Sequence, residues 1–445
     1  MRIRCRGDES AVAGLFGVRH TGRMSHPYRR TTRGLTLLAV VAGLALGGCS
    51  GDGQPDSSVS SGVVTASAPP ETTDATTSPA PTTSSLSSAG PAGTSMAAAT
   101  TSLSSTAAAI SAPPAVVSSV TVTGAVATGL TTPWGIGFLP DGTALVTERD
   151  TAKLVAISPG ASPSVRTVGV VDGVVPNGEG GLLGLATSPR FADDHIVYVY
   201  FTSANDNRIA ALTLDADATA IARQTTVLSG IPAAGNHNGG RLLAAPDGTL
   251  FVGTGDAGVK ARAQDLSSLG GKILHVTGAG APVPGHPFPE APLVYSYGHR
   301  NVQGLAFDKD GRLWASEFGQ NAYDELNVIQ PGGNYGWPAM EGPSDDPRFV
   351  PPFRYWPTSD ASPSGLAIVG GTALMATLRG ERLWLIPLGD AGGMTKPVAQ
   401  LTGSYGRLRT VLPAPDGSVW LTTSNTDGRG DVRPGDDRIL RLSLT

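Results

Sequence analysis

The segment from residue 296 to 337 concentrates polar side chains of the kinds found in catalytic and metal sites. It contains the run Gly-His-Arg-Asn-Val-Gln-Gly, then a Lys-Asp-Gly turn, then a loop with Glu317, Asp324, Glu325 and Tyr335. Carboxylates, phenols and backbone carbonyls are hard oxygen ligands that suit Ca²⁺. The segment therefore predicts a polar site that holds a cation, and a solvated acidic loop is the alternative.

A second candidate is a histidine between two asparagines, in the run Asn236-His237-Asn238-Gly239-Gly240. Imidazole titrates near neutral pH, so the His237 side chain can accept a proton from a hydroxyl group. The paired glycines lack Cβ atoms and let a ligand approach the backbone closely. We therefore consider His237 a candidate general base, with an ordinary turn histidine as the alternative.

Three further loops are rich in arginine: Arg300-Asn301-Val302-Gln303, Leu378-Arg379-Gly380 and Arg407-Leu408-Arg409. If Arg407 and Arg409 lie on a strand, their side chains face the same way. Two guanidinium groups on one face suit a ligand with several carboxylates. We expect the three loops at equivalent positions of a repeat, which favours an anion-binding pocket over solvated faces with scattered ion pairs.

The elements that would position these loops follow from a repeated turn. Asp-Gly turns, each followed by an apolar strand, occur at residues 141, 247, 310 and 416, with degenerate copies at Asp194 and Gly371. Asp-Gly supplies the positive φ of a tight hairpin turn. The intervals from 141 to 194 and from 194 to 247 are equal. Six units of roughly 50 residues predict an all-β, six-bladed propeller of four-stranded blades over residues 119–445, and a sandwich with chance turns is the alternative.

Composition agrees with a turn-rich β protein and argues against nucleic-acid binding. The chain has 445 residues with 59 glycines and 35 prolines, and its formal net charge is −4. Proteins that bind nucleic acid usually carry a basic surface, and this net charge gives no sign of one. In a propeller the loops at one end of the central channel converge, so function is expected among inter-blade loops.

The N-terminus has the features of an export signal. Residues 35–48 form an apolar run that is too short to span a bilayer comfortably, and it ends in Leu-Gly-Gly-Cys49. This ending resembles a bacterial lipobox, whose cysteine is acylated after cleavage. We expect residues 1–48 to be a signal peptide, with Met24 as the true start and lipid on Cys49. An ordinary signal peptide with a chance cysteine is the alternative.

Residues 49–118 are predicted to be a disordered tether. They are dominated by Ser, Thr, Ala and Pro, which cannot bury enough surface to offset chain entropy. The chain has only two cysteines, Cys5 and Cys49, so the folded part must be stabilised without disulfides. We expect an extracytoplasmic protein that the lipid on Cys49 anchors to the cell membrane.

Taken in order, several landmarks resemble the soluble glucose and aldose sugar dehydrogenase family, which uses pyrroloquinoline quinone (PQQ). They are TPWGIGFLPDG, GEGGLLGLATSPRF, HNGGRL, YGHRNVQGLAF, DELNVIQPGGNYGWP, and RLR followed by PDG. The resemblance runs from about Thr132 to Leu442. The signal peptide, lipobox and tether around such a domain are similar to those of a mycobacterial lipoprotein.

The resemblance implies a propeller with PQQ over the channel mouth, a sugar substrate and an external electron acceptor. His237 would remove the sugar hydroxyl proton while a hydride passes from the anomeric carbon to the quinone. The residues expected at the cofactor are Glu179, Arg300, Asn301, Gln303, Arg379, Arg407 and Arg409. Those expected at the substrate are Asn236, Asp256, Arg241 and Trp356. The carbonyls of Gly319 and Gln320 would hold the cofactor's Ca²⁺, and Glu325 and Tyr335 would match a second Ca²⁺ site.

Three positions depart from the family pattern. Asn236 replaces an aspartate before the catalytic histidine, Glu179 replaces a glutamine beside the cofactor, and Arg379 replaces a lysine. A carboxylate at Glu179 is expected to repel an anionic quinone. Asn236, Glu179 and the expected lipid anchor support an alternative function, a non-catalytic propeller lipoprotein that binds an envelope carbohydrate or a protein partner.

Overall fold

The computed structural model describes residues 116–389 and 396–445. The predicted signal peptide, Cys49 and all but the last residues of the predicted tether lie outside them. The regular secondary structure of the described residues is β-strand, apart from the short helix α1 (Phe191–Asp194) and the 3₁₀ turn η1 (Lys260–Ala263). Within these ranges, no helix has the length and apolar character needed to cross a bilayer.

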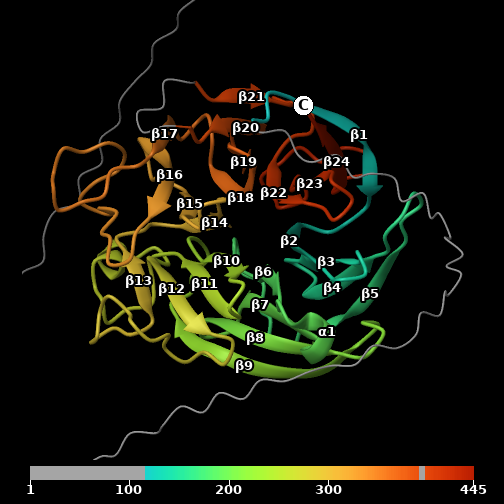
Figure 1. The fold of residues 1–445 in the computed structure, drawn as a ribbon, viewed down its shortest axis with the longest axis horizontal. Coiled ribbons are helices and arrows are strands. Elements are labelled where there is room, and N and C mark those ends of the chain that lie inside the picture. The colour runs from blue at the N-terminus through green and yellow to red at the C-terminus, as the bar shows by residue number, and fades with distance from the viewer. Residues whose placement is uncertain (1–115, 390–395) are drawn as a thin grey trace, which may run out of the picture. The chain divides into compact units, whose positions relative to one another are not determined.

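The strands form six four-stranded antiparallel sheets around a common centre (Figure 1). The first three sheets, each from its inner to its outer strand, are β2 (Pro133–Phe138), β3 (Ala144–Glu148), β4 (Lys153–Ile157), β5 (Val165–Val170); β6 (Leu182–Thr187), β7 (Ile196–Thr202), β8 (Asn207–Leu214), β9 (Ile221–Ile231); and β10 (Gly239–Ala244), β11 (Thr249–Thr254), β12 (Lys272–Thr277), β13 (Val294–Tyr297). The other three are β14 (Val302–Phe307), β15 (Leu313–Glu317), β16 (Tyr323–Ile329), β17 (Arg354–Pro357); β18 (Pro363–Val369), β19 (Thr372–Thr377), β20 (Arg382–Pro387), β21 (Val398–Gln400); and β22 (Leu408–Pro413), β23 (Val419–Thr423), β24 (Ile439–Leu444), β1 (Val120–Ala127).

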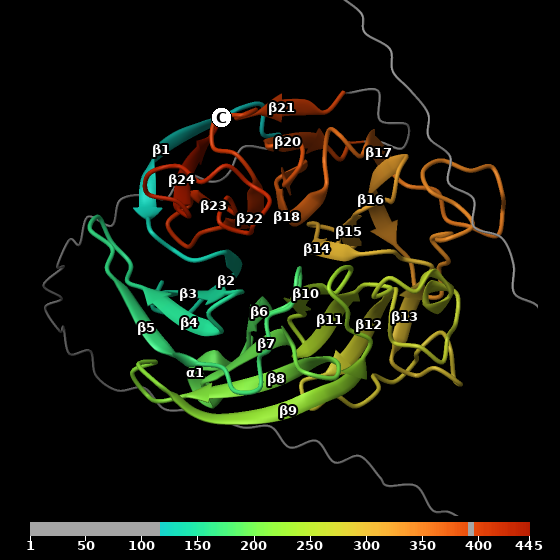
Figure 2. The same cartoon turned by 180° about the vertical axis from the view of Figure 1, so that it is seen from behind.

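The last sheet closes the ring, because its outer strand comes from the start of the described chain. Strand β1 pairs antiparallel with β24, with Val120 opposite Leu444. Ser118 and Ser119 also donate their N–H groups to the Thr445 carbonyl at 2.7 and 3.1 Å. Figure 2 shows the same closure from behind. The predicted six-bladed propeller of four-stranded blades is therefore confirmed.

The repeated turns join the inner strand of a blade to its second strand. In the first blade, Gly142 has φ 85°, and the Asp141 carboxylate accepts the Thr143 N–H at 2.8 Å. The degenerate copy at Asp194 lies in helix α1, between β6 and β7, and the copy at Gly371 lies between β18 and β19. All six copies therefore mark the same hairpin of successive blades.

Apolar residues from neighbouring sheets pack against each other to form the core. Leu145 and Leu154 of the first blade share one cluster with Val199 and Leu212 of the second, and all four are fully buried. Burying an aliphatic side chain of this size contributes about 1.5–3 kcal/mol. The contacts between adjacent blades provide the core that the sequence required in the absence of disulfides.

One charged residue inside this fold is expected to be critical for stability. Lys272 on β12 is fully buried, and its ammonium group donates to the carbonyls of Arg262, Ala263 and Gly270 at 2.6, 3.1 and 2.8 Å. The Arg262 and Ala263 carbonyls also accept the N–H groups of Asp265 and Gly298, whereas the Gly270 carbonyl has no other donor among the described residues. Lys272→Met therefore leaves one buried carbonyl without a donor, so we expect a loss of about 1–3 kcal/mol of unfolding free energy, measured by urea denaturation.

Lys309→Met is the matched control, because the Lys309 side chain is 75% exposed and pairs with Asp310 at the surface. Its unfolding free energy should stay within about 0.5 kcal/mol of the wild type. Equal stability of the two variants would show that the Lys272 contacts do not stabilise the loop at 260–271.

Candidate active site

The polar loops meet because of the way the blades are wound. In every blade the inner strand begins, and the antiparallel second strand ends, at the same end of the channel. His237, Arg300 and Arg407 precede inner strands, whereas Gly319 and Arg379 follow second strands. The expectation of equivalent blade positions is therefore wrong for Arg379, which reaches the same end of the channel from a different loop of its blade.

These loops surround a cavity of about 260 Å³. Its lining residues are Glu179, His237, Arg300, Phe318, Gly319, Gln320, Asp324, Thr358, Ser362, Arg379, Arg407 and Arg429. A smaller space adjoins it and adds Arg149, Gln303, Arg409 and Asp427. Together the two spaces are lined by six arginines and three carboxylates. The site is therefore electropositive and suits a polyanionic ligand.

His237 is held by a buried carboxylate. Its Nδ1 lies 2.7 Å from Oδ1 of Asp256, which also accepts the Gly258 N–H, while Oδ2 accepts the Trp337 indole N–H at 2.9 Å. Burial alone would raise the pKa of Asp256, but the hydrogen bond and charge of His237 and the other donors hold it below its usual range. An ionised carboxylate can only accept, so the proton of this hydrogen bond lies on Nδ1, and Nε2 is the ring nitrogen that can take a proton from a substrate.

The backbone at His237 is constrained as well. Its φ is 53°, in the left-handed region that is rare for non-glycine residues. The His237 N–H donates to Glu179 at 3.0 Å, and its carbonyl accepts the Ala257 N–H at 3.1 Å. A Cβ at Gly255 would lie 1.9 Å from that carbonyl, so glycine is required there. Such strain fits a residue held in place for function.

Glu179 is paired within the site. One oxygen accepts the His237 N–H, and the other pairs with Arg429 at 2.7 Å. Burial would raise the pKa of Glu179, but the His237 donor and the charge of Arg429 hold it below its usual range. Arg429 comes from the last blade and offsets the carboxylate that was expected to repel an anionic quinone.

Arg407 and Arg409 reach the same carboxylate. Their guanidinium groups lie 2.9 and 3.4 Å from Oδ2 of Asp427. Arg409 also contacts the side chain of Gln303 at 3.3 Å. Burial lowers the pKa of Arg409 to about 10, against the opposing charge of Asp427, so it stays protonated at neutral pH. Two arginines that share one carboxylate leave positive charge for a ligand.

Arg300 has unused hydrogen-bonding capacity. Its Nη1 donates to the Phe318 carbonyl at 3.3 Å and its guanidinium lies over the Trp337 ring, but its buried Nε has no partner. Burial lowers its pKa. Arg379 lines the cavity, is exposed, and makes no hydrogen bond or ion pair with the described residues. These free donors are what a bound carboxylate needs.

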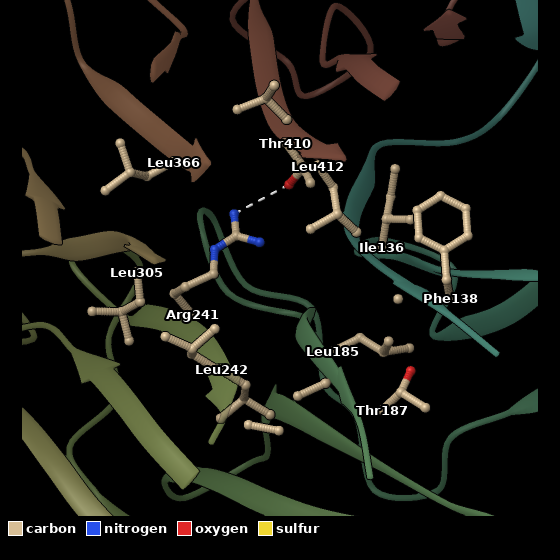
Figure 3. A pocket seen from close by; sticks show the side chains of 15 residues that line it. Ile136, Phe138, Leu185, Thr187, Arg241, Leu242, Leu305, Leu366, Thr410 and Leu412 are labelled. Atoms are coloured by element: carbon tan, nitrogen blue, oxygen red, sulfur yellow. Dashed lines mark hydrogen bonds between the residues drawn. The ribbon is translucent and has the colours of Figure 1, made fainter. Parts of the chain in front are cut away.

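One predicted contact residue, Arg241, lies deeper, where the channel continues. Arg241 donates to the Gln303 carbonyl at 2.6 Å and to the Thr410 hydroxyl at 3.1 Å, and it stacks over Trp134. It lines a separate, largely aliphatic space of about 240 Å³ (Figure 3). Burial, with a smaller effect from Arg409, lowers its pKa to about 9. The structure therefore places Arg241 in the channel rather than in the cavity with His237.

Asn301, Trp356 and Asn236 also lie outside the cavity lining. The Asn301 amide oxygen accepts the Gly239 N–H at 2.9 Å, so this side chain ties two blades together. Trp356 on β17 is buried between two blades, where it packs on Trp384 of β20 with ring centroids 5.8 Å apart. Asn236 is exposed beside His237. The expected substrate contact through Trp356 is wrong, because that ring is buried against the neighbouring blade.

The predicted metal ligands divide into two groups. Gly319 and Gln320 line the cavity, as a cofactor-bound cation would require. The Tyr335 hydroxyl instead donates to the Val328 carbonyl and accepts the Gln330 N–H, so it is not free to bind a metal. Glu325 accepts the Gly342 N–H and the Asn327 amide. In the part of the chain that the structure describes, no three His, Cys, Asp or Glu side chains gather in a metal-binding cluster.

Several residues of the site were given no specific role from the sequence. They are brought in by tertiary contacts and comprise Phe318, Asp324, Trp337, Glu341, Asp427 and Arg429. Burial raises the pKa of Asp324 to about 6. Of these, only Asp324 stood out beforehand, as one of the acidic residues of its loop.

Comparison with known proteins gives one family. The model described as Glucose / Sorbosone dehydrogenase matches residues 130–440. The PQQ-bound form of an aldose sugar dehydrogenase from Streptomyces coelicolor is 53% identical, with a TM-score of 0.72 over 75% of this chain and 100% of that chain. An uncharacterized protein of Synechocystis is 33% identical over 347 residues, which are 68% of this chain and 83% of that protein. Aldose sugar dehydrogenase YliI of Escherichia coli is 29% identical over 332 residues, 67% of this chain and 89% of that protein.

Proposed function

This chain belongs to the glucose/sorbosone dehydrogenase family, and from that premise we propose that it oxidises an aldose sugar with PQQ as its cofactor. The observation that carries the proposal is the His237–Asp256 pair at a cavity edged by arginines. When bound, PQQ supplies the acceptor for the two electrons that leave the sugar.

The residues of the chain provide the proton chemistry and the binding. Nε2 of His237 accepts the proton of the sugar's anomeric hydroxyl, and Asp256 stabilises the imidazolium that forms. The Trp337 N–H keeps the Asp256 carboxylate in position. The base is thus fixed in both tautomer and orientation before the substrate arrives, which is how positioned groups lower a barrier.

The cavity fits PQQ, a planar tricarboxylate. Arg300, Arg379, Arg407 and Arg409 would hold its carboxylates, because the first two have unused donors and the last two share one carboxylate. We further propose that the Gly319 and Gln320 carbonyls hold a Ca²⁺ ion with the cofactor. For a second Ca²⁺ ion, we propose only the Glu325 carboxylate as a ligand. The Tyr335 hydroxyl is left out because it donates to the Val328 carbonyl.

The test is a titration of PQQ into the purified protein with Ca²⁺ present, followed by cofactor absorbance and by reduction of a dye with a panel of aldoses. Saturable binding with sugar-dependent dye reduction is the expected result. Binding without turnover would favour a carbohydrate- or protein-binding propeller that has kept its pocket. Failure to bind PQQ would contradict the proposal.

Arg379→Gln should weaken PQQ binding without affecting the fold. The Arg379 side chain lines the cavity and has no partner among the described residues, so its removal leaves no carboxylate unpaired. We expect the Kd for PQQ to rise about 5- to 10-fold, as for one charge-assisted contact, with an unchanged melting temperature. Arg348→Gln is the control, because Arg348 is exposed and pairs with Asp346 outside the cavity. An unchanged Kd for Arg379→Gln would remove this residue from the cofactor site.

We propose that the protein acts outside the cytoplasm, anchored to the membrane by lipid on Cys49, and that it passes electrons to an external acceptor. The lipobox-like run before Cys49 and the Ser/Thr-rich segment after it support this location. Cys49→Ala should move the protein from the membrane fraction to the soluble one. Retention of the variant at the membrane would contradict the anchor.

A further inference from the structure

The loop that follows β15 is held by an unusual set of hydrogen bonds. Oε1 of Glu341 accepts four consecutive backbone N–H groups, those of residues 320, 321, 322 and 323, at 2.6, 2.9, 2.9 and 3.1 Å. The preceding N–H, from Gly319, donates to Oδ1 of Asp324 at 2.8 Å. Two carboxylates therefore bind five successive amides of one loop, which we call the carboxylate clamp.

The clamp determines where the carbonyl groups of the loop point. A trans peptide is planar, and its N–H and C=O point in opposite directions. The N–H groups of Gln320 and Asn321 point at Glu341, so the carbonyls of Gly319 and Gln320, in the same two peptide planes, point away from it. Gly319 and Gln320 line the cavity.

Other carbonyls of this loop already accept hydrogen bonds. The Phe318 carbonyl accepts from Arg300 at 3.3 Å, and the Ala322 carbonyl accepts the Thr358 N–H at 3.3 Å. The carbonyls of Gly319 and Gln320 accept no hydrogen bond from the described residues. The loop therefore leaves two adjacent oxygen atoms without a donor at the cavity wall.

The clamp is itself anchored from both sides. Glu325 accepts the N–H of Gly342, next to Glu341, at 2.7 Å, and Asp324 also accepts the Ser362 N–H. The turn is tight at Gly319, where a Cβ would lie 1.8 Å from the Tyr323 carbonyl. The loop is consequently fixed before any ligand binds.

We propose that Glu341, assisted by Asp324, is a positioning residue that orients the Gly319 and Gln320 carbonyls as a preformed oxygen site for the cofactor's Ca²⁺. This inference rests on the proposed PQQ-dependent function. Glu341 acts through the backbone, because its Oε1 is already surrounded by four donors. Residues that orient metal ligands affect metal affinity by about 10- to 100-fold when they are changed.

The experiment measures the Ca²⁺ concentration needed for half-maximal PQQ binding, by cofactor absorbance, in the wild type, Glu341→Ala and Glu341→Gln. We expect Glu341→Ala to raise it about 10-fold or more. We expect a smaller rise for Glu341→Gln, whose amide oxygen still accepts but lacks the charge. Excess Ca²⁺ should restore PQQ binding, and hydrogen exchange of the amides at 320–323 should be faster in Glu341→Ala.

Asp215→Ala is the matched control. The Asp215 carboxylate also accepts consecutive backbone N–H groups, from Thr219 and Ala220, but in the turn between β8 and β9. Its Ca²⁺ requirement should equal that of the wild type. An unchanged requirement in Glu341→Ala would overturn the inference and leave the proposed function intact. PQQ binding by the wild type without Ca²⁺ would overturn the inference and the proposed Ca²⁺ site, but not the proposed oxidation of a sugar with PQQ. Absence of PQQ binding in the wild type would overturn both.

Discussion

His237→Asn should lower kcat for sugar oxidation by about 10²- to 10⁴-fold, the range for loss of a positioned general base. Asparagine is chosen because the backbone at this position has φ 53°, and asparagine adopts that left-handed conformation more readily than alanine does. Its amide cannot accept the hydroxyl proton that we propose Nε2 of His237 takes. PQQ binding should change little, because the arginines of the cavity are untouched.

The matched control for this variant is His195→Asn. His195 also has a left-handed backbone, with φ 52°, but it caps helix α1 in the hairpin between β6 and β7, away from the cavity. Its kcat should be that of the wild type. Steady-state kinetics with saturating PQQ and Ca²⁺ make the comparison, and a His237→Asn enzyme with near-normal kcat would exclude His237 as the base.

Asp256→Asn is expected to lower kcat by a similar factor. The reason is that the substitution changes which nitrogen of the His237 ring carries the proton. The carboxylate accepts from three donors: His237 Nδ1, Trp337 Nε1 and the Gly258 N–H. A carboxamide must turn its NH₂ toward one of these groups. If it faces His237, the proton moves to Nε2 and the base is lost, which in a serine protease triad costs about 10⁴-fold. If the NH₂ group faces Trp337, it lies against the indole N–H, and the two donors repel each other.

The ¹⁵N shifts of the His237 ring distinguish this effect from simple loss of stability, because they report which nitrogen carries the proton. Asp308→Asn is the matched control, since Asp308 also accepts an indole N–H, from Trp314 at 2.9 Å, and a backbone N–H, from Asp310. It lies in the turn between β14 and β15, at the opposite end of its blade. We expect a comparable loss of stability, about 1–3 kcal/mol, with unchanged kcat. Equal kcat losses in the two variants would contradict the role given to Asp256.

The fold could be predicted because its information is local and repeated. Each Asp-Gly turn with its apolar strand specifies one hairpin through positive φ and side-chain alternation, as at Asp141 and Gly142. Six such units at similar spacing leave few arrangements other than a closed ring of blades. The candidate base at His237 was also visible, because an imidazole beside paired glycines is a local pattern. The expectation that Gly319 and Gln320 hold Ca²⁺ came from the family resemblance rather than from any local rule.

The partners of these residues were decided only by the closed ring. Glu179 and Arg429, 250 positions apart, and Asp256 and Trp337, 81 apart, meet because loops of different blades or elements converge at one channel end. Such loops have no periodicity that a sequence pattern can register. The sequence also did not show that the Trp356 ring is buried between two blades, or that the Tyr335 hydroxyl binds backbone groups. Side-chain identity shows what a residue can do, whereas the packing around it determines whether a ligand can reach it.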